Sequence, residues 1–199
     1  MEPRETVELH EASVESQAPI EVELRGLLTP TQYHALQQRL LDEGVPCQAD
    51  DKESYFFNFP RGVLKVCDEI SQDRGKISLK LGKEAEGALE EHEIFISRDQ
   101  VNAAITLLVA CGYGEPHQVT QDRMNYALPT ATLSLKFTED FRHHFELEGE
   151  PVYDPSFVEE EKRRLRSICL EYGLVPLEPE EIEERVNSIK RRIGFDAME

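Results

Sequence analysis

The sequence predicts an α+β protein built on an eight-stranded antiparallel β-barrel with flanking helices. Segments that alternate polar and apolar residues with a period of two recur along the chain, as is typical of β-strands. Most of these segments are joined by short connections, which favour antiparallel pairing. The polar faces of the strands repeatedly carry charged residues. An eight-stranded barrel can hold one small ligand inside, so we expect the charged faces to point inward and the apolar faces to pack against helices.

The first half of the chain supplies five of the predicted strands and the first helix. The opening strand shows the pattern, because apolar Val22 and Leu24 alternate there with charged residues. Thr29-Pro30-Thr31 begins a helix that runs to about Glu43 and ends at Gly44. The five strands span about residues 20–26, 52–59, 63–67, 76–81 and 91–96.

The second half supplies three more strands and three more helices. Apolar residues at helical spacing predict a helix from about Arg98 to Ala110, closed by Gly112. The strands follow at His117–Leu128, Thr130–Phe137 and His144–Glu150. Two helices end the chain, one after Asp154-Pro155-Ser156 to about Tyr172, and one from Pro179 to about Arg192.

Length and charge restrict the classes of protein that the chain can be. Its 199 residues provide one domain of ordinary size, and the formal charge of −18 argues against general affinity for nucleic acid or for an anionic membrane. No stretch approaches the roughly 18 apolar residues of a membrane span, and four isolated cysteines favour the reducing cytoplasm. We expect residues 1–19 to be a flexible acidic tail and residues 20–199 to be the barrel domain with its C-terminal helices.

Pairs of carboxylates on the predicted strands indicate a metal site. Two carboxylates at positions i and i+2 of a strand project side by side, and pairs on three strands provide hard oxygen ligands suited to Mg²⁺ or Mn²⁺. Basic residues on the opposite walls would hold phosphate oxygens, so the combination favours a metal-bridged polyphosphate as the ligand. Each pair taken alone is also typical of a solvated strand surface. The candidate metal ligands are Glu21, Glu23, Glu91, Glu93, Glu146 and Glu148, and the candidate phosphate-binding residues are Arg25, Lys65, Lys76, Lys80, Arg123 and Lys136.

The order of these motifs resembles the CYTH superfamily, the triphosphate tunnel metalloenzymes that include class IV adenylate cyclases, thiamine triphosphatases and inorganic triphosphatases. The resemblance runs from about Ile20 to Gly173. Its segments are Glu21-Val22-Glu23-Leu24-Arg25, similar to the N-terminal ExExK signature, Tyr55-Phe56-Phe57, Ile77-Ser78-Leu79-Lys80, Glu91-His92-Glu93, Phe145-Glu146-Leu147-Glu148 and Glu171-Tyr172-Gly173-Leu174. The resemblance implies that Glu21, Glu23, Lys80 and Glu148 are the catalytic residues.

Two departures from the family pattern bear on activity. The third strand of the family presents arginines, where this chain has only Lys65. The seventh strand of the family ends in a metal-binding aspartate, and Lys136 takes that place here. The exchange removes an oxygen ligand and adds a cation, unless a register shift of one residue turns Lys136 outward.

Three functions remain open on the sequence alone. The first is a metal-dependent phosphohydrolase acting on inorganic, nucleoside or thiamine triphosphate, with adenylate cyclase-like chemistry as its variant. The second is a module that binds a nucleotide or polyphosphate without turnover, and the third is an interaction protein whose charged strand faces are surface. Homodimer formation is also open. His143 and His144 are expected to face solvent, and Cys67 is expected to be a small buried side chain.

Overall fold

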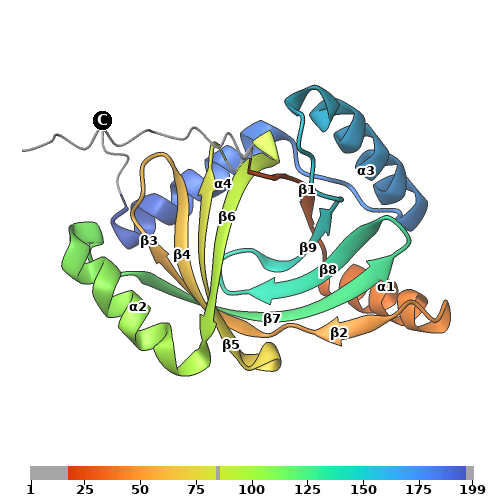
Figure 1. The fold of residues 1–199 in the computed structure, drawn as a ribbon. Coiled ribbons are helices and arrows are strands. Elements are labelled where there is room, and N and C mark those ends of the chain that lie inside the picture. The colour runs from red at the N-terminus through yellow and green to blue at the C-terminus, as the bar shows by residue number, and fades with distance from the viewer. Residues whose placement is uncertain (1–17, 84–85, 196–199) are drawn as a thin grey trace, which may run out of the picture.

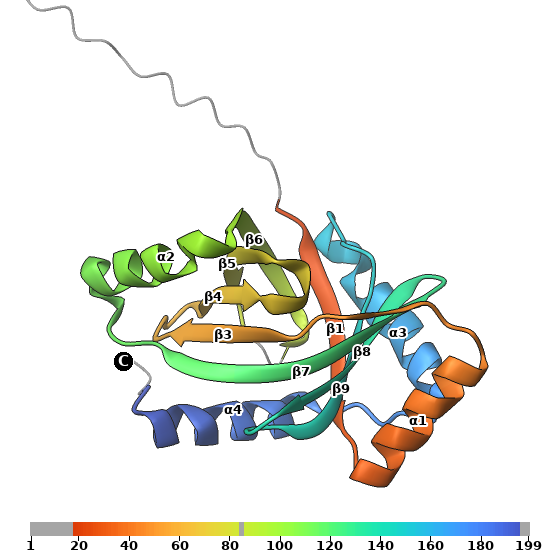
Figure 2. The same cartoon turned by 90° about the horizontal axis from the view of Figure 1, so that it is seen from below.

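The computed structural model describes residues 18–83 and 86–195, and shows a closed antiparallel barrel of eight strands (Figures 1 and 2). Around the barrel the strands follow the order β7, β3, β4, β5, β6, β1, β9, β8, and the pairing of β8 with β7 closes the ring. The strands are β1 (Ile20–Leu27), β3 (Lys52–Phe57), β4 (Gly62–Glu69), β5 (Arg74–Leu81), β6 (Ala88–Ser97), β7 (His117–Leu128), β8 (Ala131–Thr138) and β9 (Arg142–Glu148). The predicted fold class is therefore confirmed.

A short ninth strand and the helices complete the fold. The strand β2 (Cys47–Ala49) pairs with β7 alone, and its three residues were missed because they are too few to show alternation. The α-helices are α1 (Pro30–Asp42), α2 (Val101–Leu108), α3 (Val158–Tyr172) and α4 (Pro179–Ile193). They are accompanied by the short 3₁₀ helices η1 (Ile70–Gln72), η3 (Arg98–Gln100) and η5 (Pro155–Phe157) and by the π-helix η4 (Val109–Tyr113). No helix in the described part of the chain is long and apolar enough to cross a membrane.

The helices begin and end close to where the sequence predicts. Thr29 caps α1, since its hydroxyl oxygen accepts from the Gln32 backbone nitrogen and the Gln32 side chain accepts from the Thr29 backbone nitrogen. The predicted helix from Arg98 to Ala110 is divided into η3, α2 and η4. Gly112 has a φ of +94°, which ends the regular helical backbone where the sequence predicts. Residues 1–17 of the predicted acidic tail lie outside the described part of the chain. The first strand of the barrel begins at Ile20, as expected.

Two apolar clusters cover the outside of the barrel. The larger one contains Leu133, Leu135 and Leu147 from the strands, together with Leu40 of α1 and Leu165 of α3. The smaller one packs α2 against β3 and β4. Because both clusters use the outward faces of the strands, every second side chain points into the barrel, and this leaves the charged faces inside.

The segment between α3 and α4 lies directly on β1. A Cβ atom added to Gly26 would lie 2.3 Å from the carbonyl oxygen of Val175 and 2.4 Å from the Phe145 ring, so only glycine allows this approach. The backbone nitrogen of Leu177 donates to the carbonyl oxygen of Arg25 (2.8 Å). These contacts lead the chain into α4, which lies over one end of the barrel.

Candidate functional site

The barrel encloses a cavity of about 470 Å³, and every residue that the sequence analysis selected lines it. As many basic as acidic side chains line this cavity, although the whole chain carries a formal charge of −18. The predicted residues are Glu21, Glu23 and Arg25 on β1, Lys65 on β4, Lys76 and Lys80 on β5, Glu91 and Glu93 on β6, Arg123 on β7, Lys136 on β8, and Glu146 and Glu148 on β9. Their placement follows from strand alternation, whereas their individual roles stay predictions.

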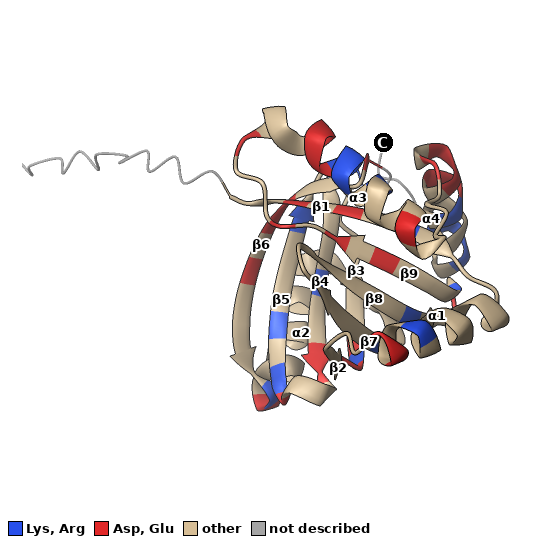
Figure 3. Cartoon of the chain, turned by 90° about the vertical axis from the view of Figure 1, so that its right-hand side faces the viewer, with Lys and Arg blue, Asp and Glu red and all other residues tan. Residues whose placement is uncertain are grey.

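Acidic and basic side chains occupy different arcs of the barrel. The six predicted metal ligands come from β6, β1 and β9, which are consecutive in the ring, and Figure 3 shows these strands marked by acidic residues beside the basic β5. The remaining five strands carry Lys52, Lys65, Lys76, Lys80, Arg123 and Lys136. Two exceptions are Arg25 within the acidic arc and Glu69 within the basic arc. The cavity thus has an acidic wall facing a basic one.

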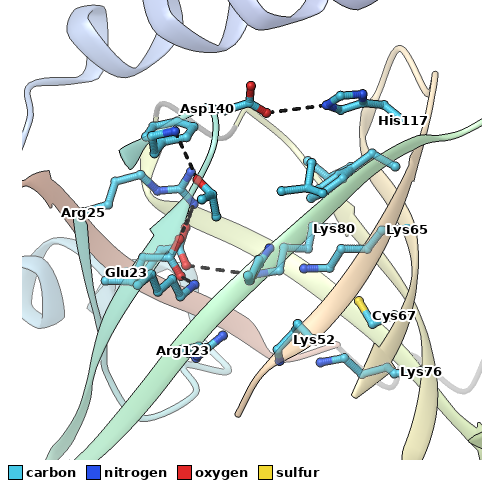
Figure 4. Close-up of a pocket in the computed structure, with 18 of the residues that line it drawn as sticks. Glu23, Arg25, Lys52, Lys65, Cys67, Lys76, Lys80, His117, Arg123 and Asp140 are labelled. Carbon is cyan, nitrogen blue, oxygen red and sulfur yellow. Dashed lines mark hydrogen bonds and ion pairs between the residues drawn. The ribbon is translucent and has the colours of Figure 1, made fainter. Parts of the chain in front are cut away.

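Lys80 joins the two walls at the boundary between β5 and β6. Its ammonium group forms an ion pair with Glu21 and lies 3.8 Å from a Glu91 oxygen. It also lies 4.0 Å from an oxygen of Glu23, and Figure 4 shows Lys80 and Glu23 facing each other. Burial opposes the charge of Lys80, but the attraction of Glu23 and Glu21 outweighs it and raises the pKa of Lys80. The side chain is therefore held as a cation among the carboxylates.

The acidic wall carries more negative charge than its cations neutralise. Burial and repulsion by Glu23 raise the pKa of Glu21 to about 7 despite the contact with Lys80. The same two causes raise the pKa of Glu148, whose strand position lies directly opposite Glu23. For Glu23 itself, burial is outweighed by Arg25 and Lys80, and its pKa is lowered. An added cation would therefore reduce the repulsion on Glu21 and Glu148 most and stabilise their ionised forms.

Lys136 enters the cavity at the other boundary, between β8 and β9. Its residue is 5% exposed, and its ammonium group forms an ion pair with Glu146. The position removes the alternative in which a register shift turns Lys136 outward. Burial opposes the negative charge of Glu146, but Lys136 and Arg25 outweigh it and hold the pKa of Glu146 well below its usual value. Glu146 is therefore neutralised by residues of the chain itself.

A second group of charges lies at the end of the cavity away from α4, and among its members only Lys76 was predicted as a site residue. Glu69 is 2% exposed, and three cations surround it: Arg74 at 2.5 Å, Lys52 at 3.4 Å and Lys76 at 3.7 Å. Lys52 also lies 3.0 Å from Asp50. The signal was present in the sequence, because Glu69 lies four residues after Lys65 on the same strand face. We call these five residues the Glu69 network.

The prediction that His144 faces solvent is wrong. His144 is two residues before Glu146 on β9, so strand alternation turns it into the cavity, where burial lowers the pKa of its ring to about 4. Its Nδ1 lies 2.9 Å from the carbonyl oxygen of Arg142. His143 points outward and contacts the rings of Tyr33 and Phe137. Cys67 is buried as expected, and it faces the cavity beside Ser54.

The donor set on the acidic wall fits a hard divalent cation, although the carboxylates are not yet gathered around one point. Among the described residues, no group of three or more histidine, cysteine, aspartate or glutamate side chains is arranged to hold a metal ion. Lys80 holds Glu21 in this arrangement. Binding of a cation by Glu21 requires this ion pair to open, which would release Lys80 toward the rest of the cavity.

Comparisons with solved structures place this barrel in a known fold. The PH1012 protein from Pyrococcus horikoshii is 20% identical with a TM-score of 0.68, and the match covers 80% of this chain and 94% of that one. A proposed adenylate cyclase from Vibrio parahaemolyticus is 15% identical with a TM-score of 0.62, over 79% and 91% of the two chains. A proposed adenylyl cyclase from Hippeastrum, described as having a dominant triphosphatase activity, is 19% identical with a TM-score of 0.55, over 79% and 89%.

These likenesses show the fold of the chain. No protein-family model and no curated protein matches the sequence. The closed barrel and its internal tunnel are the fold expected of the CYTH superfamily, so the fold that the resemblance implies is confirmed. Activity does not follow from fold alone and has to be argued from the residues of the cavity.

Replacing Glu21 and Glu146 by glutamine should change stability in opposite directions at pH 8. The pKa of Glu21 is higher in the folded than in the unfolded chain, so this group makes stability fall as the pH rises from about 4.5 to 7. We expect Glu21→Gln to remove that loss and to stabilise the protein at pH 8 by up to about 3 kcal/mol. Glu146→Gln removes the ion-pair partner of the buried Lys136, and should destabilise the protein by up to about 3–5 kcal/mol.

Urea unfolding of the wild type and both variants at pH 5 and pH 8 measures these changes. Glu90→Gln is the matched control, because Glu90 lies on the exposed face of β6 and its replacement should stay within about 0.5 kcal/mol. Equal destabilisation by Glu21→Gln and Glu146→Gln at pH 8 would contradict the unequal neutralisation of the acidic wall.

Proposed function

We propose that the protein is a divalent-cation-dependent phosphohydrolase that binds a triphosphate in the barrel cavity. The observation that carries this proposal is the separation of an acidic from a basic wall inside a closed barrel. A triphosphate is a chain of anionic groups that needs cations along its length, and a bridging metal needs oxygen ligands on one side. A cavity with one wall of each kind complements both at once.

The basic wall would hold the phosphate oxygens. The Lys65 ammonium nitrogen lies 6.0 Å from the centre of the Phe56 ring, and its charge helps to lower the pKa of Glu91. Lys65 lines the cavity, where its charge can also attract a ligand. Arg123 donates to Asn125 (2.6 Å) and Ser134 (2.9 Å), which fixes its guanidinium against the wall. The proposed phosphate-binding set is Arg25, Lys65, Lys76, Lys80, Arg123 and Lys136.

The acidic wall would hold Mg²⁺ or Mn²⁺. Glu21, Glu23 and Glu148 are the proposed ligands, and their repulsion is the physical reason that a cation would bind there. Glu91 and Glu93 extend the wall along β6. Glu146 was included among the predicted ligands, but its neutralisation by Lys136 and Arg25 makes it the least suited of the six.

The same arrangement supports hydrolysis. A bound metal ion would polarise the terminal phosphoryl group and lower the pKa of a water molecule. Water attacks the terminal phosphorus, the bond from that phosphorus to the bridging oxygen breaks, and a proton of the water passes to a phosphate oxygen. The negative charge of the leaving group is then neutralised by the basic wall, with Lys80 between the two walls.

Glu148→Gln tests the proposed activity. We expect it to lower metal-dependent turnover at least about 100-fold while the protein stays folded, because the variant keeps the shape of the side chain and loses the anionic oxygen. The assay measures phosphate and pyrophosphate release from inorganic triphosphate, ATP and thiamine triphosphate with Mn²⁺, Mg²⁺ or EDTA. Glu150→Gln, two residues further on and exposed, is the control. Wild-type turnover in Glu148→Gln would show that Glu148 has no part in the reaction.

One observation favours a second candidate, a module that binds triphosphate with little turnover. Lys136 is inside the cavity and pairs with Glu146, where the family resemblance implies a metal-binding aspartate. Burial lowers the pKa of Lys136 to about 7, so the side chain is charged mainly below that pH. When charged, it repels a metal ion and attracts a phosphate oxygen. Adenylate cyclase-like chemistry is a further outcome of the same substrate panel, since it would release pyrophosphate and a cyclic nucleotide from ATP.

Lys136→Asp separates the enzyme from the binding module. If Lys136 limits metal binding, the variant should turn over triphosphate faster with excess Mn²⁺ and bind triphosphate more weakly in EDTA. We expect the wild type to bind triphosphate with micromolar to millimolar affinity, which corresponds to a binding free energy of about −8 to −4 kcal/mol. Lys136→Gln is the control, because it removes the charge without adding a ligand and should weaken metal-free binding only. Unchanged binding and turnover in Lys136→Asp would show that Lys136 contacts neither ligand.

A further inference from the structure

One edge of β6 has no partner strand over most of its length. Residues 90–97 pair with β5 along one side, which Figure 3 shows, but on the other side the ladder with β1 ends at Glu90. The backbone nitrogen of Glu91 still donates to the carbonyl oxygen of Pro19 (3.1 Å). Beyond Glu91, no strand in the described part of the chain pairs with this edge. The edge from residue 92 to residue 97 is therefore open to another strand.

The open edge is apolar as well as unpaired. Ile94 is 63% exposed and Phe95 is 53% exposed, and Ile96 comes directly after them. Neither a proline nor a lysine interrupts residues 92–97, and the carboxylate of Glu93 is already paired with Lys76. An exposed apolar edge is a template for pairing with other chains, and proteins normally cover or interrupt such an edge. We therefore expect another segment to cover this edge of β6.

Positive charge lies beside the open edge, at the mouth of the cavity away from α4. The guanidinium carbon of Arg74 lies 4.3 Å from the centre of the Phe95 ring, and the ammonium nitrogen of Lys76 lies 6.0 Å from the same point. Arg74 also pairs with Glu69, so this part of the edge adjoins the Glu69 network, and the Arg74 side chain is 47% exposed. A strand that carries a carboxylate along this edge would be attracted by Arg74.

The chain that precedes β1 has the position and the charge to pair with this edge. Residues 1–17 lie before the described part and carry one arginine, Arg4, against the glutamates Glu2, Glu5, Glu8, Glu11 and Glu15. The strand β1 begins directly beside the open edge, because Ile20 pairs with Glu90. A segment attached at that point has a high effective concentration at the edge, which a separate partner lacks.

The register of β1 determines which residues would meet. Antiparallel pairing that continues the ladder between β1 and β6 brings Gln17 opposite Glu93 and Glu15 opposite Phe95. Side chains of directly opposite residues lie on the same face of a sheet. Glu15 would therefore lie beside Phe95, on the face that carries Arg74. The neutral Gln17 would lie beside Glu93, where a carboxylate would be repelled.

We propose that residues 13–17 extend β1 as a strand along the open edge of β6 and place Glu15 beside Arg74 at the mouth of the cavity. The strand would cover Ile94 and Phe95 and narrow the opening beside the Glu69 network. A second copy of the chain is a less suitable occupant, because two β6 strands would bring together two sets of the acidic residues Glu90, Glu91 and Glu93. The inference goes beyond the proposed function and does not depend on it.

Two proline substitutions in the full chain test the proposed pairing. Pro19 accepts from β6, so alternation points the backbone N–H of Gln17 toward β6 and that of Ser16 away from it. Gln17→Pro removes a hydrogen bond of the proposed ladder, whereas Ser16→Pro, the matched control, removes none. Amide hydrogen exchange measured by NMR then reports on the edge. We expect the amides of Glu93 and Phe95 to exchange about tenfold or more slowly in the wild type and in Ser16→Pro than in Gln17→Pro.

Glu15→Lys tests the contact with Arg74. The variant would place a cation beside Arg74, so we expect exchange of the Phe95 amide to become about threefold or more faster than in the wild type. Glu8→Lys makes the same change of charge outside residues 13–17, and should leave that exchange unchanged.

Each outcome of these measurements supports or overturns the inference. Equal exchange of the Glu93 and Phe95 amides in the wild type and in Gln17→Pro would overturn it, as would equal acceleration by Gln17→Pro and Ser16→Pro. Protection that rises with protein concentration, together with a dimer in analytical ultracentrifugation, would assign the edge to a second copy and also overturn it. Equal effects of Glu15→Lys and Glu8→Lys would show that the proposed register is wrong.

Discussion

The whole arrangement depends on the register of a closed sheet. In a barrel, every second side chain must enter the interior, and the pairing of Glu23 with Glu148 and of Arg123 with Lys136 fixes which side chains these are. A shift of one residue would move the charges into the outer apolar clusters and the leucines into the cavity. Leu133, Leu135 and Leu147, all fully buried outside the barrel, therefore stabilise the register that holds the charged residues inside.

Placing so many charges inside a barrel is tolerated because ion pairs form both where the two walls meet and within each wall, as between Glu69 and Arg74. Lys80 pairs with Glu21 and Lys76 with Glu93 along β5 and β6, while Lys136 pairs with Glu146 at the boundary of β8 and β9. These pairs do not neutralise the whole acidic wall, as the raised pKa values of Glu21 and Glu148 show. A bound metal ion would relieve the repulsion that remains among the carboxylates of the acidic wall. The same residues therefore lower the stability of the protein and favour the proposed binding.

The sequence predicts the barrel and most of the cavity because both follow from a period of two. Glu21, Lys80 and Glu146 could be assigned to one interior from alternation and from the resemblance together. Glu69, Lys52 and His144 obey the same periodicity and were missed. The ion-pair partners of Glu69 and Lys52 are recognisable only once the strand order is known. The α4 end could not be predicted from local pattern, because its contact with the barrel depends on Asp140 and on the close approach at Gly26.

The central claim is that one wall of the cavity binds a metal ion and the other binds the phosphates. A crystal structure of the protein with Mn²⁺ and inorganic triphosphate tests it directly, because an anomalous difference map locates the manganese. The account predicts a manganese peak about 2.0–2.2 Å from carboxylate oxygens of β1 and β9, in the range of a hard octahedral cation, with phosphate density against Lys65 and Arg123. Manganese bound outside the barrel, or phosphate density on its outer surface with the cavity occupied by solvent, would contradict it.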